Sequence, residues 1–519
     1  MLQMALFPHN SNSKVTELIP ILIYICLYNI LNNNQAMKFP FLILIFSLAT
    51  LTVFADKPVK IYNELYRPQF HFTPEKNWHN DPNGLVFYKG EYHMFYQYNP
   101  FGNEWGFMHW GHAISTDLVH WEHLPIALFP DNESKDKELC TAFSGCGLID
   151  KNNLTGLQKG DEKTILLFYT SQKCGQRLAY SNDKGRTWLK YEKNPIIAFD
   201  ETDDARDPKV FWHEPSKQFV MVLYRRPNND DRQKGVSFYT SKNLINWDFK
   251  SHLPGFFECP DLVELSVNRR SDDKKWVLFD GDGSYVIGSF NGEKFMPDSP
   301  KMPGDFGANY YATQTWSNIP ESDGRTIQIA WMKGGEFKGM PFNGQMTFPC
   351  ELSLKKYTEG IKLIRKPIKE IELLHEKGEK WENENLIPGL NKNLTRGVKG
   401  DCMHIIGSFN IKTADSFGFV VRLDKSDSGT EIMYNVKNKT LSCMAKSAIV
   451  EPIDGVLKLE ILMDRSSIEI FANEGKVAMS SCFSPMENAN GLYLFNTGGE
   501  LLVEKLEIYP LTSIWKTEK

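Results

Sequence analysis

Asp81, Asp207 and Glu258 are acidic residues whose neighbours could fix the direction of a carboxylate and control its charge. Each aspartate stands directly before a proline, and Glu258 stands two positions before one. Proline restricts its own backbone and that of the preceding residue, so side chains placed there point in a defined direction. Taken singly, either aspartate could equally be an ordinary turn residue.

The surroundings of these carboxyl groups suit different chemical roles. Asn80 and Asn83 flank Asp81 closely enough to donate hydrogen bonds that would keep it ionised, as a nucleophile requires. Phenylalanine rings and a thiol beside Glu258 should raise its pKa, as a general acid requires. Cleavage of a glycosidic bond is one chemistry that uses two carboxyl groups, which flank that bond. The residues by themselves predict a carboxylate cluster and no sharper function.

Asp207 and the histidines allow two further interpretations. Arg206 precedes Asp207 in an Arg-Asp-Pro bend, so this carboxylate is suited to accept hydrogen bonds from the hydroxyl groups of a sugar. His79 and His109 raise the question of a metal site, but they show no ligand spacing such as HExxH. We therefore predict no metal site.

A self-similar element recurs in the chain after about residue 62. It consists of a strand-like run, a polar turn and an aromatic residue that opens the next strand. The copies lie at residues 112–121, 178–188, 238–247 and, more faintly, 287–295. A repeat of this length made of short strands is typical of a β-propeller blade. With a first blade around residues 80–110 and a last one around 310–350, we predict five blades.

A propeller explains how acidic residues that are far apart in sequence could act together. The innermost strand of each blade lines the central channel, so side chains from separate blades can converge at one end of it. Asp81, Asp207 and Glu258 are spaced widely enough to lie on three different blades. The repeat thus predicts a single carboxylate cluster.

The pattern changes after the last predicted blade. We predict an all-β chain in which a five-bladed β-propeller at residues 62–355 is followed by a linker at 356–390 and a β-sandwich at 391–515. The linker contains a charged run with helical spacing, Ile368–His375. Alternating strands with regular short turns then favour a sandwich over a sixth blade.

Residues 1–55 are predicted to be a leader that carries a signal peptide. A true start at Met37 would give a Lys, an apolar run and small residues at Val53 and Ala55, with cleavage after Ala55. A membrane anchor is the alternative, but neither of the two apolar runs, Ile19–Leu27 and Phe39–Phe54, reaches the ~20 apolar residues of a spanning helix. We therefore expect a secreted, extracellular protein.

Cysteines and glycosylation sequons fit the secretory route. Eight cysteines follow the leader, and their spacing matches neither a CxxC pair nor a zinc site, which leaves disulfide pairing open. Four Asn-x-Ser/Thr sequons begin at Asn132, Asn153, Asn393 and Asn438.

Composition excludes several classes of partner. The 519 residues are 41% hydrophobic and 24% charged with a net charge of −5, which is typical of a globular protein without a basic surface. We therefore predict neither nucleic acid nor a membrane surface as a partner, and a small molecule as the substrate. The oligomeric state is left open.

Three ordered segments resemble glycoside hydrolase family 32, which includes invertases, inulinases and fructan hydrolases. Trp78-His-Asn-Asp-Pro-Asn-Gly84 is similar to the family's W-M-N-D-P-N-G box, Arg206-Asp-Pro208 to its R-D-P box and Glu258-Cys-Pro260 to its E-C-P box. The similarity extends in order from about Arg67 to about Pro510.

The resemblance implies a retaining β-fructofuranosidase, acting through a covalent fructosyl-enzyme and without a cofactor. Asp81 would be the nucleophile, Glu258 the acid/base and Asp207 the residue that holds fructose hydroxyl groups at the transition state. The residues that it implies for substrate binding are Asn80, Gln97, Trp105, Phe143, Ser144, Arg206 and Trp331.

Two positions depart from the family pattern. His79 replaces a methionine beside the nucleophile, and a titratable group there could shift the pH optimum. Cys350 replaces an arginine in a Pro-Arg-Glu-Leu segment, which removes a cation and adds a thiol that could bridge another cysteine. Neither position is one of the three acidic residues, so we expect an active enzyme.

Sucrose is the first substrate that the sequence favours, with raffinose and fructans as possible further substrates. A fructan exohydrolase or inulinase specificity is the alternative within the same class, since loops between strands set the leaving-group subsite. A non-catalytic fructan-binding protein is the alternative from another class, and the intact set of Asp81, Asp207 and Glu258 argues against it.

Overall fold

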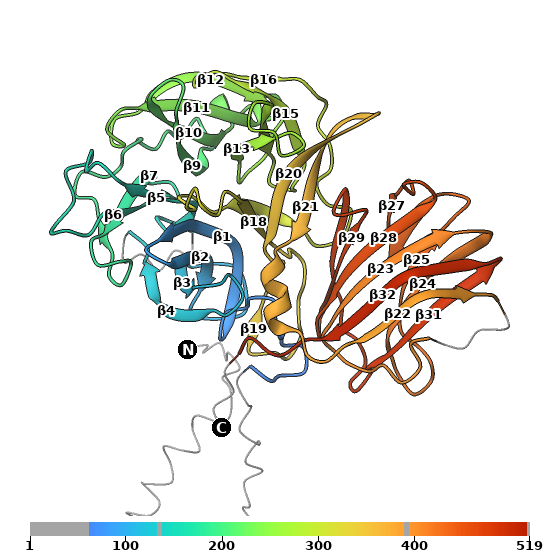
Figure 1. The fold of residues 1–519 in the computed structure, drawn as a ribbon. Coiled ribbons are helices and arrows are strands. Elements are labelled where there is room, and N and C mark those ends of the chain that lie inside the picture. The colour runs from blue at the N-terminus through green and yellow to red at the C-terminus, as the bar shows by residue number, and fades with distance from the viewer. Residues whose placement is uncertain (1–61, 132–137, 389–393, 516–519) are drawn as a thin grey trace, which may run out of the picture. The chain divides into compact units, whose positions relative to one another are not determined.

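The computed structural model describes residues 62–131, 138–388 and 394–515. The described residues form one compact unit. The predicted leader with Met37 and Ala55 lies outside the described residues, as do the sequons at Asn132 and Asn393. The fold is a five-bladed β-propeller followed by a β-sandwich (Figure 1).

The propeller consists of five four-stranded antiparallel blades. Blade 1 contains β1 (Asn77–Tyr88), β2 (Glu91–Asn99), β3 (His109–Ser115) and β4 (Glu122–Leu128). Blade 2 contains β5 (Ala142–Asp150), β6 (Thr164–Ser171), β7 (Gly175–Ser181) and β8 (Leu189–Lys190). Blade 3 contains β9 (Arg206–His213), β10 (Gln218–Arg225), β11 (Gly235–Ser241) and β12 (Asp248–Pro254), with short 3-10 helices η1 (Pro227–Asn229) and η2 (Asp231–Gln233).

The last two blades complete the ring. Blade 4 contains β13 (Asp261–Ser266), β14 (Lys274–Phe279), β15 (Tyr285–Phe290) and β16 (Phe295–Pro297). Blade 5 contains β17 (Tyr311–Thr315), β18 (Thr326–Trp331), β20 (Cys350–Tyr357) and β21 (Gly360–Pro367). The short strand β19 (Phe342–Asn343), which lies between β18 and β20 in the chain, pairs in parallel with β1 and so joins blade 5 to blade 1.

The repeat seen in the sequence is a recurring turn after the third strand of a blade. Ser115, Ser181 and Ser241 end β3, β7 and β11, and each hydroxyl group donates to the side chain two residues later. That side chain then accepts backbone N–H groups of the following turn. Local side-chain bonds of this kind fix a turn, which explains why the element recurs in blades 1, 2 and 3.

The segment 356–390, predicted as a linker, contains regular structure over most of its length. β21 pairs along its length with β20 and completes blade 5. A 3-10 helix, η3 (Lys369–Leu374), follows, and β22 (Glu379–Leu386) pairs with β32 of the sandwich. β22 is an edge strand with nearly all its side chains in solvent, so it lacks the alternating pattern that reveals a half-buried strand.

The sandwich packs two antiparallel sheets face to face. The six-stranded sheet has the order β22, β32 (Leu501–Pro510), β23 (Met403–Ile411), β28 (Val456–Met463), β29 (Ser467–Ala472) and β30 (Val477–Cys482). The five-stranded sheet has the order β27 (Lys446–Ile449), β26 (Thr440–Cys443), β25 (Thr430–Asn435), β24 (Ala414–Leu423) and β31 (Gly491–Gly498).

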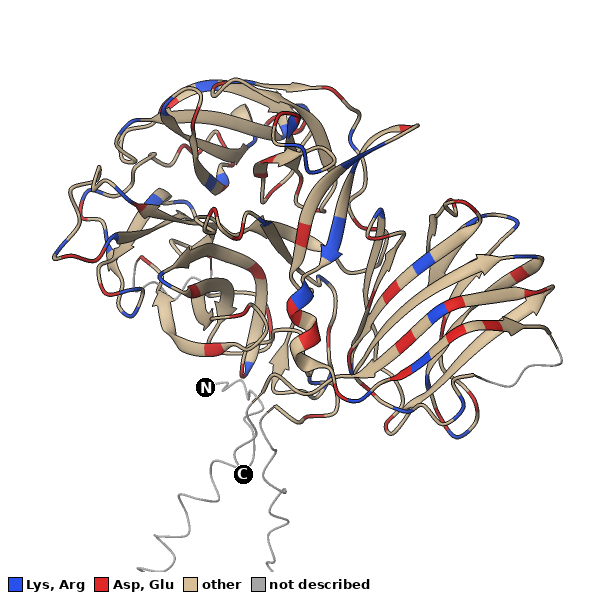
Figure 2. Ribbon diagram, in the orientation of Figure 1, with Lys and Arg blue, Asp and Glu red and all other residues tan. Residues whose placement is uncertain are grey.

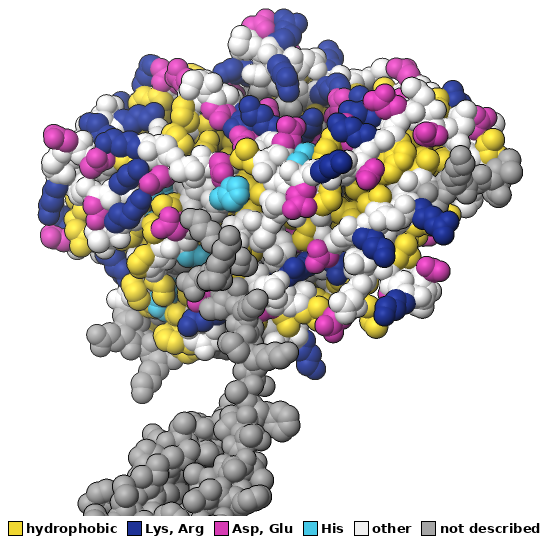
Figure 3. All heavy atoms as spheres, turned by 60° about the horizontal axis from the view of Figure 1, so that its bottom comes forward, with side chains coloured by type: hydrophobic (Ala, Val, Ile, Leu, Met, Phe, Trp, Pro, Cys, Tyr) yellow, Lys and Arg dark blue, Asp and Glu magenta, His cyan; other side chains and the backbone are white. Residues whose placement is uncertain are grey.

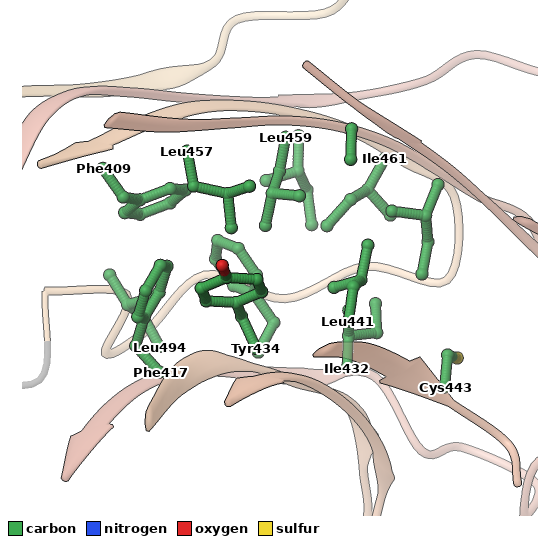
Figure 4. Close-up of a cluster of buried hydrophobic side chains, with 14 of the residues drawn as sticks. Phe409, Phe417, Ile432, Tyr434, Leu441, Cys443, Leu457, Leu459, Ile461 and Leu494 are labelled. Atoms are coloured by element: carbon green, nitrogen blue, oxygen red, sulfur yellow. The ribbon is translucent and has the colours of Figure 1, made fainter. Parts of the chain in front are cut away.

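The core of the sandwich lies between these sheets. Phe409, Leu457, Leu459 and Ile461 face Phe417 and other side chains of the opposite sheet (Figure 4). Charged residues occur along the strands of the sandwich (Figure 2). This inward apolar and outward polar alternation is what the sequence shows as period-2 strands.

A buried histidine connects the segment before blade 1 to the sandwich. His71 Nδ1 lies 2.9 Å from Asp464 Oδ2, and His71 Nε2 lies 2.9 Å from Glu469 Oε2. Asp464 also accepts the backbone N–H groups of Gln69, Phe70 and His71. The two carboxylates raise the pKa of His71 to about 9 although its burial acts in the opposite direction. The imidazole is therefore a cation held between two buried anions.

One disulfide, Cys140–Cys174, links the segment before β5 to the hairpin between β6 and β7. The other cysteines of the described residues are free thiols: Cys146, Cys259, Cys350, Cys402, Cys443 and Cys482. Cys350 is buried and its thiol lies 3.4 Å from the carbonyl oxygen of Phe348, so the expectation that it could bridge another cysteine is wrong.

Surface and helix content complete the description. On the face shown in Figure 3, positive and negative side chains are interspersed. Among the residues described, no helix is long and apolar enough to cross a membrane.

Candidate active site

All ten residues singled out from the sequence line one pocket of about 370 Å3. They are Asn80, Asp81, Gln97, Trp105, Phe143, Ser144, Arg206, Asp207, Glu258 and Trp331. The pocket has three further lining residues that the sequence analysis missed, Trp78, Tyr311 and Lys333. The volume is at the lower end of the range for small-molecule sites.

Strands from different blades bring these side chains together. Asp81 lies in β1, Ser144 in β5 and Asp207 in β9. Glu258 lies three residues before the start of β13. Tyr311 begins β17. Each of these strands is the first of its blade, which is the arrangement expected when inner strands converge on a central channel.

Asp81 sits at an irregularity of β1. The pairing of β1 with β2 shifts between His79 and Pro82, as in a β-bulge, and bulges commonly redirect side chains beside active sites. Ser144 Oγ donates to Asp81 Oδ2 at 2.6 Å, and Asn80 Nδ2 donates to Oδ1 at 3.1 Å. Asn83 does not donate to Asp81 but accepts the N–H of Gly145.

Burial and hydrogen bonds act in opposite directions on Asp81. Burial raises the pKa of its carboxyl group, the bonds from Ser144 and Asn80 counteract this rise, and the nearby charge of Glu258 adds to it. The net pKa is above the usual value for aspartate. The sequence predicted the donor Asn80 but not the extent of burial.

Burial and neighbouring charges also act on Asp207. Burial raises its pKa to about 7, the Arg206 cation opposes the rise, and the charges of Glu258 and Asp81 reinforce it. Its Oδ2 accepts the backbone N–H of Cys259 at 3.0 Å. A carboxyl group with this pKa changes its charge near neutral pH.

Glu258 has a polar environment in place of the apolar one that we expected. Arg206 Nη2 donates to its Oε1 at 2.7 Å, and the Tyr311 hydroxyl group donates to its Oε2 at 2.5 Å. The thiol of Cys259 instead points between the two aspartates, 3.6 Å from Asp81 Oδ2 and from Asp207 Oδ2. The rings that precede Glu258 in sequence do not supply the contacts of its carboxyl group.

Backbone strain accompanies the acidic residues. Asp207, Glu258 and Cys259 have φ angles of 62°, 57° and 40°, in the left-handed region that few residues other than glycine adopt. Such conformations cost of order 1–3 kcal/mol each and cluster at functional sites. The surrounding blades must therefore hold these carboxylates in place against local preference.

Aromatic and cationic side chains complete the walls of the pocket. Trp105 is 40% exposed and its ring contacts Phe143 edge to face, while Trp331 packs against Trp78 and Tyr311. Gln97 donates to the carbonyl oxygen of Ala142. The exposed ring and the buried polar groups provide both an apolar surface and hydrogen-bond partners for a sugar.

The missed residues differ in the signal that could have revealed them. Trp78 belongs to the first sequence box and precedes the nucleophile candidate by three positions. Tyr311 and Lys333 lie in and after strands of blade 5, in no recognisable motif, and the Lys333 ammonium lies 3.7 Å from the centre of the Tyr311 ring. Only the closure of the propeller brings them to the pocket.

His79 lies in the core on the far side of β1 from the pocket. Its ring is fully buried against Phe72 and Tyr96, and neither ring nitrogen has a hydrogen-bond partner among the described residues. Burial lowers its pKa to about 3. A histidine with this pKa is neutral at mildly acidic and neutral pH, which argues against the expected shift of the pH optimum.

Replacing His79 with Met is accordingly expected to leave both limbs of the pH profile of kcat/KM on sucrose within about 0.3 pH units of the wild type. The reason is that a neutral side chain is exchanged for another neutral side chain of similar size. Initial rates between pH 3.5 and 8 would show this. A displaced limb would mean that His79 titrates in the active protein.

No group of three or more His, Cys, Asp or Glu side chains in the described part of the chain is placed to hold a metal ion. The chemistry available in the pocket is that of carboxyl, hydroxyl, guanidinium and thiol groups.

Comparison with known proteins gives the family. Residues 71–367 match the model of the Glycosyl hydrolases family 32 N-terminal domain, and residues 370–510 match that of the family 32 C-terminal domain. The chain is 40% identical over 504 residues to a levanase of Bacillus subtilis, covering 88% of this chain and 72% of the levanase.

Solved structures agree with the sequence comparison. The exo-inulinase of Aspergillus awamori superposes with a TM-score of 0.76 at 27% identity, covering 88% of this chain and all of the inulinase. A fructofuranosidase of Schwanniomyces occidentalis in complex with fructose superposes with a TM-score of 0.75 at 26% identity, covering 87% of this chain and 99% of that protein. The chain therefore belongs to glycosyl hydrolase family 32 and is a glycoside hydrolase that acts on β-fructosides.

Proposed function

We propose that this protein is a retaining β-fructofuranosidase that removes the terminal β-D-fructofuranosyl unit from sucrose and from fructans. The observation that carries the proposal is the meeting of Asp81, Asp207 and Glu258, from three blades, in one small pocket. The pocket is small enough to favour one terminal sugar unit over the middle of a chain.

In the first step Asp81 attacks C2 of the fructosyl unit while Glu258 protonates the leaving oxygen. The bond between C2 and that oxygen breaks, a covalent fructosyl ester of Asp81 forms, and the alcohol departs. Asn80 and Ser144 hold the attacking carboxylate by their hydrogen bonds. Arg206 and Tyr311 fix the orientation of Glu258 and stabilise the carboxylate that remains once its proton has left.

In the second step the Glu258 carboxylate accepts a proton from water, which attacks C2 and releases Asp81. The product fructose keeps its anomeric configuration because two displacements have occurred. Asp207 lies close to Asp81, because the Cys259 thiol contacts the carboxylates of both residues. We assign it to the fructose hydroxyl groups, whose hydrogen bonds strengthen as positive charge develops at C2.

Substrate preference within β-fructosides is the finer part of the proposal. The relatives are named as a levanase, exo-inulinases and an invertase, which covers both polymeric and disaccharide substrates. A non-catalytic fructan-binding role gains nothing from the geometry, because the carboxylates, their donors and the pocket are all present.

Glu258→Gln tests the assignment of the acid/base. The variant is expected to lose about 10²–10⁴-fold of kcat on sucrose, whose leaving group needs protonation, and much less on a fructoside with an activated leaving group. Glucose release from sucrose and chromophore release from an aryl fructoside measure the two. An equal loss on both substrates would contradict the role of Glu258. Wild-type protein that binds fructosides but releases no sugar would overturn the enzyme proposal itself.

Secretion is proposed on the strength of the sequence before residue 56 and of the disulfide Cys140–Cys174. Two of the sequon asparagines, Asn153 and Asn438, lie on the surface where a glycan could be attached. Relatives such as the exo-inulinase of Aspergillus awamori are named as extracellular.

A further inference from the structure

The strand β30 forms one edge of the six-stranded sheet of the sandwich, so one side of its backbone has no neighbouring strand in that sheet. Unpaired N–H and C=O groups at a sheet edge are normally covered or bonded by another part of the protein. Here the propeller supplies the partner. Residues 305–309, which lead from blade 4 to Tyr311 at the start of β17, lie along this edge.

Backbone hydrogen bonds join this segment to alternate residues of β30. The N–H of Phe306 donates to the carbonyl oxygen of Ala478 at 2.8 Å, and the N–H of Asn309 donates to the carbonyl oxygen of Ser480 at 3.0 Å. The side chain of Asn309 continues the pattern, because its Oδ1 accepts the N–H of Cys482 at 2.8 Å. The segment thus satisfies the outward backbone groups of the edge strand.

Gly307 allows the segment to approach β30 this closely. A Cβ atom at this position would lie 2.1 Å from the carbonyl oxygen of Ser480. Any other residue would therefore push the segment away from the strand. The local sequence is suited to contact with the sandwich.

The residues that follow β18 lie against the same edge. Asn309 Nδ2 donates to the carbonyl oxygen of Lys333 at 2.7 Å. Gly335 lies against Cys482, since a Cβ atom at position 335 would lie 2.5 Å from the Cys482 sulfur. The buried side chain of Asn309 therefore connects the backbone of β30 to the backbone of Lys333.

The two propeller segments held in this way lead to side chains that act on the proposed proton donor. The Lys333 ammonium lies 3.7 Å from the centre of the Tyr311 ring, and the Tyr311 hydroxyl group donates to Glu258 Oε2 at 2.5 Å. A cation on the face of a ring fixes the ring and makes its hydroxyl group a better donor. Burial raises the pKa of Tyr311 and the charge of Glu258 adds to the rise, so the hydroxyl group keeps its proton.

Other titratable and charged groups also surround Tyr311 and Glu258. They are Asp81 of β1, Arg206 and Asp207 of β9, and Cys259 before β13. Among the charged residues described in the pocket, Lys333 is the one bonded to Asn309. Its position therefore depends on the sandwich.

We infer that the sandwich takes part in the reaction, because β30 positions Lys333 and Tyr311 through Asn309, and this pair orients Glu258 for proton transfer to the leaving oxygen. Asn309 and Lys333 are positioning residues that act through Tyr311 and Glu258. The inference rests on the proposed function, since it requires Glu258 to be the acid/base.

Two variants interrupt the connection at different points. Asn309→Asp keeps the acceptor for the N–H of Cys482 but replaces the donor to Lys333 with an oxygen that repels its carbonyl group. Lys333→Met removes the cation from an exposed side chain. Each is expected to lower kcat/KM about five- to twentyfold on sucrose and less than about twofold on an aryl fructoside with an activated leaving group, because only sucrose needs full protonation.

The pH profile separates an action through Glu258 from a direct contact between Lys333 and the leaving sugar. Loss of a nearby cation favours the protonated acid, so the basic limb of kcat/KM on sucrose should move to higher pH by at least about 0.3 units in Lys333→Met. Lys333→Arg keeps the charge and should keep this limb within about 0.2 units of the wild type. Initial rates between about pH 4 and 8.5 measure it. A basic limb that stays in place in Lys333→Met would overturn the inference.

Matched controls make the same kinds of contact away from the pocket. Asn473 is also buried, donates to one carbonyl oxygen and accepts one backbone N–H. Lys476 lies 4.2 Å from the centre of the Tyr357 ring. Asn473→Asp and Lys476→Met are expected to affect the two substrates equally. Discrimination by these controls, or equal losses on both substrates in the two test variants, would contradict the inference.

Glu258→Gln in the same assay keeps the two proposals apart. If this variant loses activity equally on both substrates, the proposed role of Glu258 fails. If it discriminates between the substrates while Asn309→Asp and Lys333→Met do not, the inference about the sandwich fails alone. Circular dichroism and thermal unfolding verify that each variant is folded, and Lys333→Met tests the connection from its solvent side if Asn309→Asp does not fold.

Discussion

Changing Asp81 to Asn is expected to lower kcat on sucrose by about 10⁴-fold or more, because an amide cannot form the covalent ester on which the proposed reaction depends. The side chain keeps its shape, and Ser144 and Asn80 remain as neighbours, so the fold should persist. Because Asp81 is buried, the folded state accommodates a neutral amide there at least as well as a charged carboxylate.

Glucose release measures the loss, and circular dichroism and thermal unfolding check the fold. Asp298→Asn is a suitable control because Asp298 is an exposed aspartate of the same propeller, paired with Lys275 on the surface. The control should keep its activity within about twofold of the wild type. More than a tenth of the wild-type kcat in Asp81→Asn would show that another group is the nucleophile.

Replacing His71 with Gln is expected to lower the free energy of unfolding by about 3–5 kcal/mol, because it removes one partner of a buried ion network and leaves Asp464 and Glu469 without their cation. These carboxylates lie in the sandwich, whereas His71 lies in the segment before blade 1. The variant should therefore weaken the packing of the segment before blade 1 against the sandwich. Urea unfolding of both proteins measures it.

The effect of this variant should depend on pH in a defined direction. The pKa of His71 is raised to about 9, so its contribution to stability is complete below the ordinary histidine value of about 6.5 and is lost as the pH rises through 9. The pKa of Asp464 is lowered, so its contribution is present above its ordinary value and is lost as the pH falls. The difference between wild type and variant should be larger at pH 5.5 than at pH 9.5.

His120→Gln provides the comparison for His71. His120 also lies beside an aspartate, Asp117, but on the surface, where half of its side chain is exposed. Exposed ion pairs contribute little, so this control should change stability by less than about 1 kcal/mol. Equal losses in the two variants, or a His71 effect that does not vary with pH, would show that the buried imidazole is not charged.

Several parts of this protein were accessible from local sequence because their causes are local. The turn after the third strand of a blade depends on a Ser and an Asp or Asn two residues apart, and its repetition predicted the propeller. Period-2 alternation predicted the sandwich. The edge strand β22 was not predicted, because exposure on both of its faces removes that alternation.

For the active site, the sequence likewise predicted the identity of the acidic residues better than their contacts. Asp81, Asp207 and Glu258 stand in short segments with prolines, and resemblance to family boxes identified them. The environment of each was predicted less well, since Asn83 bonds to Gly145 and Glu258 bonds to Arg206 and Tyr311. Those partners come from other blades, so the sequence around each acidic residue does not reveal them.

The sequence by itself determined the class of fold, the family and the identity of the acidic residues, because turn chemistry, strand periodicity and motif order are properties of neighbouring residues. Only the tertiary structure decided the charge of His71, the neutrality of His79, the contacts of Glu258 and the contact of Asn309 with the sandwich. Burial and electrostatic interaction depend on distance in space, and a propeller places residues from all its blades within contact of one another at the central channel.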